Sequence, residues 1–324
     1  MHVFTHRPRE GLAGYEDPPD FDVSRFSEWT RTRRFELAPG LWRDLRRRED
    51  LGVVHAHSFH GSAAILAASA TDSPFVFTPH FHRVGHSKLA RIAHLAYDRP
   101  ARRLFERANV VTCVSHAEAA LVADAYPCAA KIVVVPNGID VENIRDAQPF
   151  PRDCPIVLSA GRLETYKQVD LAIRVMQYLP DAELVVCGRG PEERALRALA
   201  NASGVADRVR MLGFVSDEEL HRWLRTASVT LALSRHEAFG LIALEAATAG
   251  SAVVASDIPA HAELEIQLNG LMRLVPVDVS AGALADAVRS ELQSHSDVRI
   301  QGVLSWTDVT SQMESVYERA AVGR

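Results

Sequence analysis

The sequence predicts an α/β protein with two Rossmann-like domains that face a cleft. Short apolar segments of strand length alternate with helical segments along the chain. The alternation stops at residues 146–154, a stretch with two prolines and no periodicity, and then restarts. Two similar halves joined by such a linker fit two parallel sheets covered by helices, and ligands of such sheets bind beyond the carboxyl ends of the strands.

The first half is predicted to hold one parallel sheet. Apart from a strand at its start, the region 1–50 is charged and without periodicity, which indicates irregular structure. The expected strands are 2–5, 51–57, 75–78, 110–114 and 131–136, and the expected helices are 61–70, 87–108 and 116–126.

The second half repeats this organisation. Pro191 opens one helix, and Gly250 closes another that begins after Gly240. The expected strands are 156–161, 182–188, 209–212, 229–233 and 252–255, and helices are expected at 168–178 and 306–321. We therefore expect an N-terminal domain at 1–148, a C-terminal domain at 149–305, and a helix at 306–324 that packs back toward the N-terminal domain.

The composition excludes several classes of protein. Of 324 residues, 47% are apolar and 24% are charged, and a net charge of -5 argues against a nucleic-acid binder. No apolar run is long enough to span a membrane, and the N-terminus lacks the apolar core of a signal peptide. The cysteines at 113, 128, 154 and 187 form no C-x-x-C pair, so neither disulfides nor zinc is expected. We expect a cytoplasmic protein, at most peripheral to a membrane.

The most informative stretch is Ser-Arg-His-Glu-Ala-Phe-Gly-Leu-Ile-Ala-Leu-Glu-Ala at 234–246. Glu237 precedes a predicted helix, and Glu245 lies about two turns inside it, roughly 12 Å along the axis. These carboxylates are too far apart to hold one atom, but they suit a ligand with a polyol at each end and an anion between. The amides and dipole at the helix start favour that anion. A sugar, a diphosphate and a ribose in a row would fit; the alternative is a surface loop before a core helix with two chance glutamates.

The whole string resembles the E-x7-E element of retaining glycosyltransferases of the GT-B fold, most closely family 4. By that resemblance, Glu237 binds hydroxyls of the donor sugar and Glu245 binds the ribose. The backbone amides of Phe239, Gly240 and Leu241 would contact the sugar and the phosphate. The resemblance also implies that the second domain binds the donor and the first binds the acceptor.

The loop after the first strand of the second domain carries two cations. Gly161, Arg162 and Leu163 follow the strand, and Lys167 comes shortly after. Arginine and lysine suit a diphosphate, and the pattern is similar to the family's G-R-L-x-x-x-K motif. By that resemblance, Arg162 and Lys167 neutralise the diphosphate as it leaves. The alternative is a solvated surface pair.

Two further loops resemble nucleotide contacts of the family. Gly188-Arg189-Gly190-Pro191 is no dinucleotide fingerprint, because Glu193 stands where that pattern needs glycine. Gly188 and Gly190 form either a tight turn before a helix or, as in the family, a loop beside the nucleotide. Val215, in Leu-Gly-Phe-Val-Ser, is similar to the loop that lines the base.

Histidines gather near strand ends of the first half, but their spacing does not establish the converging geometry that metal ligands need. They are His55, His57, His60, His80 and His82. The family often has a histidine near the reacting sugar at the position of His80, with His57 as the second candidate.

The triplet Asp20-Phe21-Asp22 spells the D-x-D that binds a metal in the other major glycosyltransferase fold. Here it stands in a proline-bearing polar loop with no predicted strand beside it, so we interpret it as a coincidence. GT-B enzymes resemble one another in using basic side chains and a helix dipole in place of that metal. No metal cofactor is therefore expected, and the donor substrate would be a nucleotide-diphosphate sugar.

Residues 83–107 carry more cations than anions. Such a segment is either a solvated helical face or a contact with the acceptor or an anionic membrane surface. The cations are Arg83, Lys88, Arg91, Arg99, Arg102, Arg103 and Arg107, and the anions are Asp98 and Glu106.

The resemblance covers nearly the whole chain from His2 onward. Family members begin with a strand, a glycine-rich loop and a long helix before the segment similar to 2–5, so we expect an N-terminally truncated first domain and weak transfer. The predicted function is a retaining glycosyltransferase that moves a sugar from a nucleotide sugar to a glycan, lipid-linked or small-molecule acceptor. The alternatives are a GT-B sugar-nucleotide epimerase and a non-catalytic sugar-nucleotide-binding homologue or partner subunit.

Overall fold

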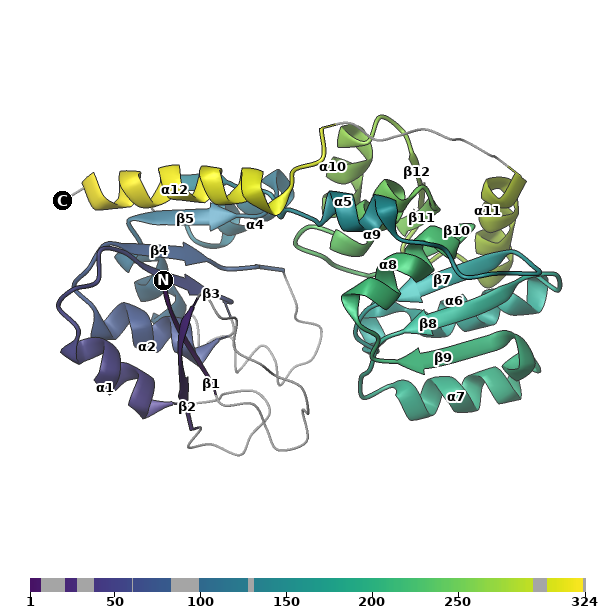
Figure 1. Ribbon diagram of the computed structural model, residues 1–324, viewed down its shortest axis with the longest axis horizontal. Coiled ribbons are helices and arrows are strands. Elements are labelled where there is room, and N and C mark those ends of the chain that lie inside the picture. The colour runs from purple at the N-terminus through teal and green to yellow at the C-terminus, as the bar shows by residue number, and fades with distance from the viewer. Residues whose placement is uncertain are drawn as a thin grey trace. The chain divides into compact units, whose positions relative to one another are not determined.

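The computed structural model describes residues 1–6, 21–27, 38–59, 61–82, 99–127, 131–293 and 302–322 (Figure 1). These residues form two compact units, each with its own parallel sheet. Unit 1 comprises Met1–Val135 with Ser311–Arg324, and unit 2 comprises Pro136–Thr310. Parallel sheets covered by helices confirm the predicted α/β class, with a Rossmann-like arrangement in each unit.

Unit 1 is built on a four-stranded parallel sheet in the order β3-β4-β5-β6. The strands are β3 (Val54–His57), β4 (Phe75–Thr78), β5 (Val110–Cys113) and β6 (Lys131–Val134). Every residue of β4 and β5 is buried, as expected for inner strands covered on both faces. The helices are α1 (Pro39–Arg47), α2 (Ser62–Ala70), residues 99–107, α4 (His116–Ala125) and the later part of α12 (Trp306–Val322).

The first fifty residues hold more regular structure than the sequence indicates. β1 (His2–His6) pairs in parallel with β2 (Asp22–Phe26), and α1 follows. The helix was missed because Leu41 and Leu45 are its buried residues and charged side chains dominate the rest. Asp22 begins β2, so the expectation that no strand adjoins the D-x-D triplet is wrong; Asp20 lies outside the described residues.

Parts of other predictions also lie outside the described residues. Residues 99–107 of the predicted helix at 87–108 are helical, and 83–98 are not described. The same holds for His60 and Cys128. None of the described helices has the length and apolar character needed to cross a membrane.

Unit 2 contains a six-stranded parallel sheet in the order β12-β11-β10-β7-β8-β9. Its strands are β7 (Ile156–Ala160), β8 (Glu183–Cys187), β9 (Val209–Gly213), β10 (Val229–Ala232), β11 (Ala252–Ser256) and β12 (Met272–Val275). Its helices are α5 (Val141–Asp146), α6 (Val169–Val175), α7 (Glu193–Ala202), α8 (Asp217–Thr226), α9 (Leu241–Ala249), α10 (Pro259–Gln267) and α11 (Ala281–Gln293). Figure 1 shows α6, α7 and α11 around this sheet.

The strand order of unit 2 indicates where a ligand would bind. From β7 the chain adds β8 and β9 on one side, and then returns to place β10 on the other side of β7. The strand order therefore reverses between β7 and β10. In open parallel sheets, the crevice beyond the carboxyl ends of the strands at such a switch point is the usual ligand site.

The two units divide after Val135 rather than at the predicted 148/149 position. The physical reason is α5, which follows the turn at 136–139 and packs against α8 and α9 of unit 2.

The turn at 136–139 also contacts the segment before α12. The Ile139 N–H donates a hydrogen bond to the carbonyl of Leu304 at 3.1 Å. At the other end of α12, the Tyr317 hydroxyl and His55 Nδ1 lie 2.9 Å apart within unit 1.

Candidate functional site

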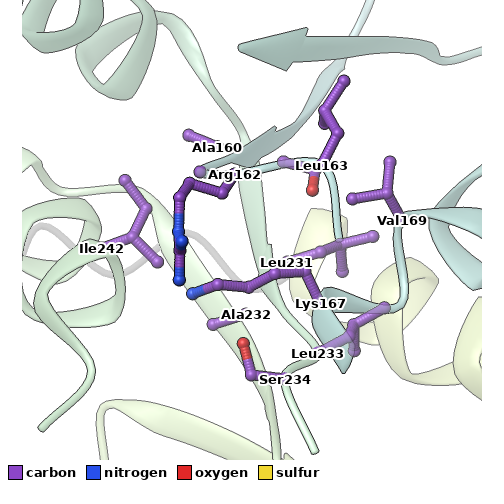
Figure 2. Close-up of a pocket in the computed structure, with 12 residues that line it drawn as sticks. Ala160, Arg162, Leu163, Lys167, Val169, Leu231, Ala232, Leu233, Ser234 and Ile242 are labelled. Carbon is purple, nitrogen blue, oxygen red and sulfur yellow. The ribbon is translucent and has the colours of Figure 1, made fainter. Parts of the chain in front are cut away.

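A pocket lies at the switch point of unit 2, where β7 and β10 end (Figure 2). It is lined by residues 159–163, where β7 ends and its loop begins, by 231–234 at the end of β10, and by Lys167, Val169 and Ile242. Both predicted phosphate-binding cations, Arg162 and Lys167, reach into it (Figure 2). The lining is thus mostly apolar, with the two cations among its polar members.

Lys167 is paired with Glu237 at this pocket. The Lys167 ammonium donates to Glu237 Oε1 at 2.5 Å, and the Ser234 hydroxyl donates to the same oxygen at 2.6 Å. Burial alone would raise the pKa of Glu237, but Lys167, with help from Ser234 and His261, lowers it below its ordinary value. The carboxylate is therefore held ionised and oriented, with Lys167 as its counter-ion.

Local backbone features bring Lys167 to this position. It ends a 3₁₀ turn at Thr165–Lys167, after which Gln168 adopts a left-handed conformation with φ of 52° and α6 begins. Tyr166 stacks on His236 with ring centroids 4.3 Å apart, and its carbonyl accepts the Arg235 N–H at 2.8 Å. These contacts join the turn after β7 to the loop that follows β10.

Arg162 is placed differently from Lys167. Its side chain is 70% exposed, and its guanidinium donates to Glu164 at 2.9 Å and to the Tyr166 hydroxyl at 3.2 Å. Both partners belong to the same loop, so Arg162 is oriented locally but remains open to solvent. Arg162 and Lys167, for which the sequence predicts the same role, therefore differ in burial and in counter-ion.

The glycines of the two loops allow them to pack against each other. A Cβ added at Gly188 would lie 1.8 Å from the Gly161 carbonyl oxygen, and one at Gly190 would lie 2.2 Å from the Leu163 carbonyl oxygen. Gly188 also has φ of 134°, which L side chains rarely adopt. The Leu163 N–H donates to the Arg189 carbonyl at 2.9 Å across this contact. Close packing against the loop after β7 therefore accounts for glycine at both positions.

The helix α9 begins at the site with an uncapped end. Gly240 is its N-cap, with φ of 103°, and no side chain accepts a hydrogen bond from the first turn. Phe239 before it is buried, whereas Leu241 after it is 37% exposed. Such a helix start offers backbone N–H groups and the positive end of the dipole to an anion.

His261 is a residue at this site that sequence reasoning missed. It lies on the first turn of α10, is 1% exposed, and its Nδ1 lies 2.9 Å from the Ser256 carbonyl. A Cβ on Gly240 would lie 2.9 Å from its Cδ2. Burial lowers the pKa of His261, and the ring is electrostatically coupled to Glu237 and Lys167. The signal available in the sequence was its position just after β11, at the same edge of the sheet.

Glu245 and Val215 lie on neighbouring elements. Glu245 is half-buried on α9; burial, and then the charge of Asp217 at the start of α8, raise its pKa to about 7. Val215 is half-buried in the loop between β9 and α8, beside Phe214, which is 74% exposed. The carboxylate of Glu245 is therefore close to the balance between its two protonation states at neutral pH.

His80 belongs to unit 1, in the loop after β4. It has φ of 48°, and its Nε2 lies 3.3 Å from Nδ1 of His57. Burial, and then the neighbouring histidines, lower the pKa of both rings, that of His57 to about 4. Within the described residues, no group of three or more His, Cys, Asp or Glu side chains is arranged to hold a metal ion.

Comparisons with known proteins find matches over both halves of the chain. Residues 140–299 match the family described as glycosyl transferases group 1, and residues 1–143 match glycosyltransferase family 4. The chain is 30% identical over 309 residues, 84% of this chain and 73% of the relative, to the D-inositol 3-phosphate glycosyltransferase of Xylanimonas cellulosilytica.

Solved structures share the fold. The sucrose-phosphate synthase of Thermosynechococcus elongatus has a TM-score of 0.82 at 21% identity, covering 98% of this chain and 88% of that one. The HepE protein of Anabaena, solved in complex with UDP-glucose, has a TM-score of 0.73 at 18% identity, covering 92% of this chain and 86% of that one. At sequence identities this low, the similarity shows a shared fold and no more.

Proposed function

The chain belongs to glycosyltransferase family 4, the glycosyl transferases group 1, and from this premise we propose that it is a retaining glycosyltransferase whose donor is a nucleoside-diphosphate sugar bound by unit 2. The observation that carries the proposal is the pocket at the β7/β10 switch point. There, two cations and the uncapped start of α9 stand beside a counter-ion-paired carboxylate, Glu237. This combination suits an anion joined to a polyol.

Each part of the donor is assigned to one part of the site. The diphosphate would lie against Arg162, Lys167 and the first amides of α9. The sugar hydroxyls would donate to Glu237, and the ribose hydroxyls to Glu245. Gly188 and Gly190 would let backbone approach the nucleotide, and the loop with Val215 would line the base. The UDP-glucose complex of HepE, which shares the fold, supports this class of donor.

The proposed reaction breaks the bond between the anomeric carbon and the diphosphate oxygen. The acceptor hydroxyl attacks from the face that the diphosphate leaves, and the departing phosphate oxygen takes its proton, so no separate carboxylate base is needed. Lys167, Arg162 and the α9 dipole stabilise the negative charge that develops on the diphosphate. The protein's contribution is positioning and electrostatic stabilisation, without a metal ion.

The acceptor is assigned by class. The relative from Xylanimonas is named for an inositol phosphate acceptor, which supports a polyol or polyol-phosphate acceptor, free or lipid-linked. Unit 1 is expected to bind it. Exposed arginines on helical residues 99–107, among them Arg102 and Arg103, would assist by contacting an anionic membrane surface.

The test begins with the purified chain. Thermal shift against UDP, GDP, ADP and TDP identifies the base, and the matching sugar nucleotides are then incubated with inositol phosphates, phosphatidylinositol and short glycans. We expect nucleotide-dependent stabilisation and a product whose anomeric configuration, read by NMR, equals that of the donor. An inverted product would contradict the retaining mechanism. Conversion of the donor to its epimer, or binding without transfer to any acceptor, would favour the two alternatives named above.

A further inference from the structure

Glu118 is a buried carboxylate that the proposed chemistry does not use. It lies on the first turn of α4 in unit 1 and is 1% exposed. Its Oε1 accepts the backbone N–H of Phe81 at 2.5 Å, and its Oε2 accepts that of Val114 at 2.7 Å. Burial raises the pKa of Glu118 to about 7, although both hydrogen bonds favour the ionised form and oppose the shift.

Helix capping does not explain these two bonds. Ser115 is the N-cap of α4, and its hydroxyl accepts the Glu118 N–H at 2.9 Å. In the usual S-x-x-E capping box, the glutamate side chain returns to the N–H of the cap residue. Glu118 instead reaches Val114 at the end of β5 and Phe81 in the loop after β4. The carboxylate thus joins the carboxyl ends of two neighbouring strands.

The loop that Glu118 holds is the one that carries His80. On one side of His80, the Pro79 carbonyl accepts the Phe59 N–H at 2.6 Å. On the other, the Phe81 ring packs against Phe59, with centroids 4.9 Å apart, and its N–H is bound by Glu118. Between these anchors His80 has φ of 48°, a conformation that a residue with a side chain keeps only where its surroundings hold it.

We propose that Glu118 is a positioning residue for the transferase reaction, which fixes the loop after β4 and with it the position of the His80 imidazole. The inference rests on the proposed function and on the role in transfer that the family resemblance implies for His80. Glu118 itself touches no substrate and acts through the backbone of Phe81.

The experiment is a double-mutant cycle with a matched control. Glu118→Gln keeps the size of the side chain but turns an N–H₂ toward one of the two backbone N–H groups. We expect kcat to fall roughly tenfold or more, with nucleoside-diphosphate affinity within about twofold of wild type, because unit 2 is untouched. If Glu118 acts through His80, the double variant with His80→Ala should be no slower than His80→Ala alone.

Ser115→Ala is the control. It removes the cap of the same helix but leaves the loop anchor in place, so its kcat should stay within about twofold. Retained kcat in a folded Glu118→Gln variant, or additive losses in the cycle, would overturn the inference. If Glu118→Gln does not fold, Glu118→Asp takes its place in the cycle, since it keeps the charge and shortens the reach.

A spectroscopic readout separates this inference from the proposed function. The His80 ring signals are identified in the NMR spectrum of histidine-labelled protein by their loss in His80→Ala. They should shift in Glu118→Gln and stay in place in Ser115→Ala. If His80→Ala leaves kcat unchanged, the proposed role of His80 in the reaction fails, and these shifts alone show whether Glu118 positions the His80 ring. An unchanged His80 signal in Glu118→Gln would refute the positioning role of Glu118.

Discussion

The Lys167 ammonium lies 2.5 Å from Glu237 Oε1, so the cation expected to bind phosphate is already neutralised by the carboxylate expected to bind the sugar. Both side chains are mostly buried, at 18% and 19% exposure. A diphosphate that reaches Lys167 must therefore share it with Glu237. In the proposed complex, the pair would couple the two halves of the donor, because the sugar hydroxyls and the phosphate would approach groups that hold each other in position.

Glu237→Ala should separate nucleotide binding from transfer. Without the carboxylate, Lys167 is free to pair with the diphosphate, and a negative charge that would repel the diphosphate is gone. Affinity for the nucleoside diphosphate should therefore be equal to or higher than in wild type. Transfer should fall roughly a hundredfold or more, since the sugar loses its acceptor of hydrogen bonds. Calorimetry with the nucleoside diphosphate and initial-rate assays measure the two effects. Lost nucleotide affinity in this variant, with Glu245→Ala unaffected, would reverse the two assigned roles.

Lys167→Ala and Arg162→Ala should weaken nucleoside-diphosphate binding to a similar extent, but they should differ in their effect on the free energy of unfolding. Each should weaken nucleoside-diphosphate binding by roughly 1.5–3 kcal/mol, the range for charge-assisted hydrogen bonds. Lys167→Ala should also lower the free energy of unfolding by about 2 kcal/mol, because it leaves the Glu237 charge buried without its counter-ion. Arg162 is 70% exposed, so its loss should change stability by no more than about 0.5 kcal/mol. Urea unfolding and calorimetry on both variants test this; unchanged nucleotide affinity in both would reject the diphosphate assignment.

Gly188→Ala should destabilise unit 2 severely. The new methyl group would lie 1.8 Å from the Gly161 carbonyl oxygen, so the loops after β7 and β8 could no longer pack together. We expect a loss of at least about 3 kcal/mol in unfolding free energy. Gly204→Ala is the matched control, since Gly204 also has a positive φ, of 67°, but nothing lies within 4 Å of its added Cβ. Its cost should be about 1 kcal/mol, and equal losses in the two variants would contradict the packing argument.

Membrane contact is tested at Arg102 and Arg103, which are exposed on the described helix residues 99–107. Replacing both with alanine should weaken binding to anionic vesicles by about 1 kcal/mol for each charge, and added salt should weaken binding of the wild type. The double lysine variant, which keeps the charge, serves as the control in vesicle sedimentation. Equal binding to neutral and anionic vesicles would rule out the electrostatic contact.

The sequence was sufficient for features that depend on local pattern. Apolar strand segments predicted the inner strands β4, β5, β7, β8 and β10, and Gly250 correctly ended α9. The sequence was insufficient where burial is sparse. The helix α1 buries only Leu41 and Leu45, and in the short strand β12 only Met272 and Val275, at its two ends, are buried.

The pairing of Lys167 with Glu237 could not be predicted from spacing. The two are 70 positions apart and meet only because β10 returns beside β7. The burial of His261 against Gly240 has the same origin, as it depends on β11 lying next to β10. Motifs therefore identified the loops of the site, whereas strand order decided which side chains pair there.

Glu245 leads to a prediction about pH. Burial and Asp217 raise its pKa to about 7, so near neutral pH an appreciable part of the free protein carries the protonated form. A protonated carboxyl accepts hydrogen bonds from ribose hydroxyls less well than a carboxylate, so binding favours ionisation. Affinity for the nucleoside diphosphate should therefore rise, by up to about tenfold, between pH 6 and pH 8 and then level off.

Two variants isolate this dependence from the titration of the phosphates, which all forms of the protein share. Glu245→Gln cannot ionise, so its affinity profile should lose the rise that belongs to the carboxylate. Asp217→Asn removes the neighbouring negative charge, which should lower the pKa of Glu245 and move the rise to lower pH. Calorimetry across the pH range measures all three profiles. Superimposable profiles for wild type and Glu245→Gln would show that Glu245 does not bind the nucleotide.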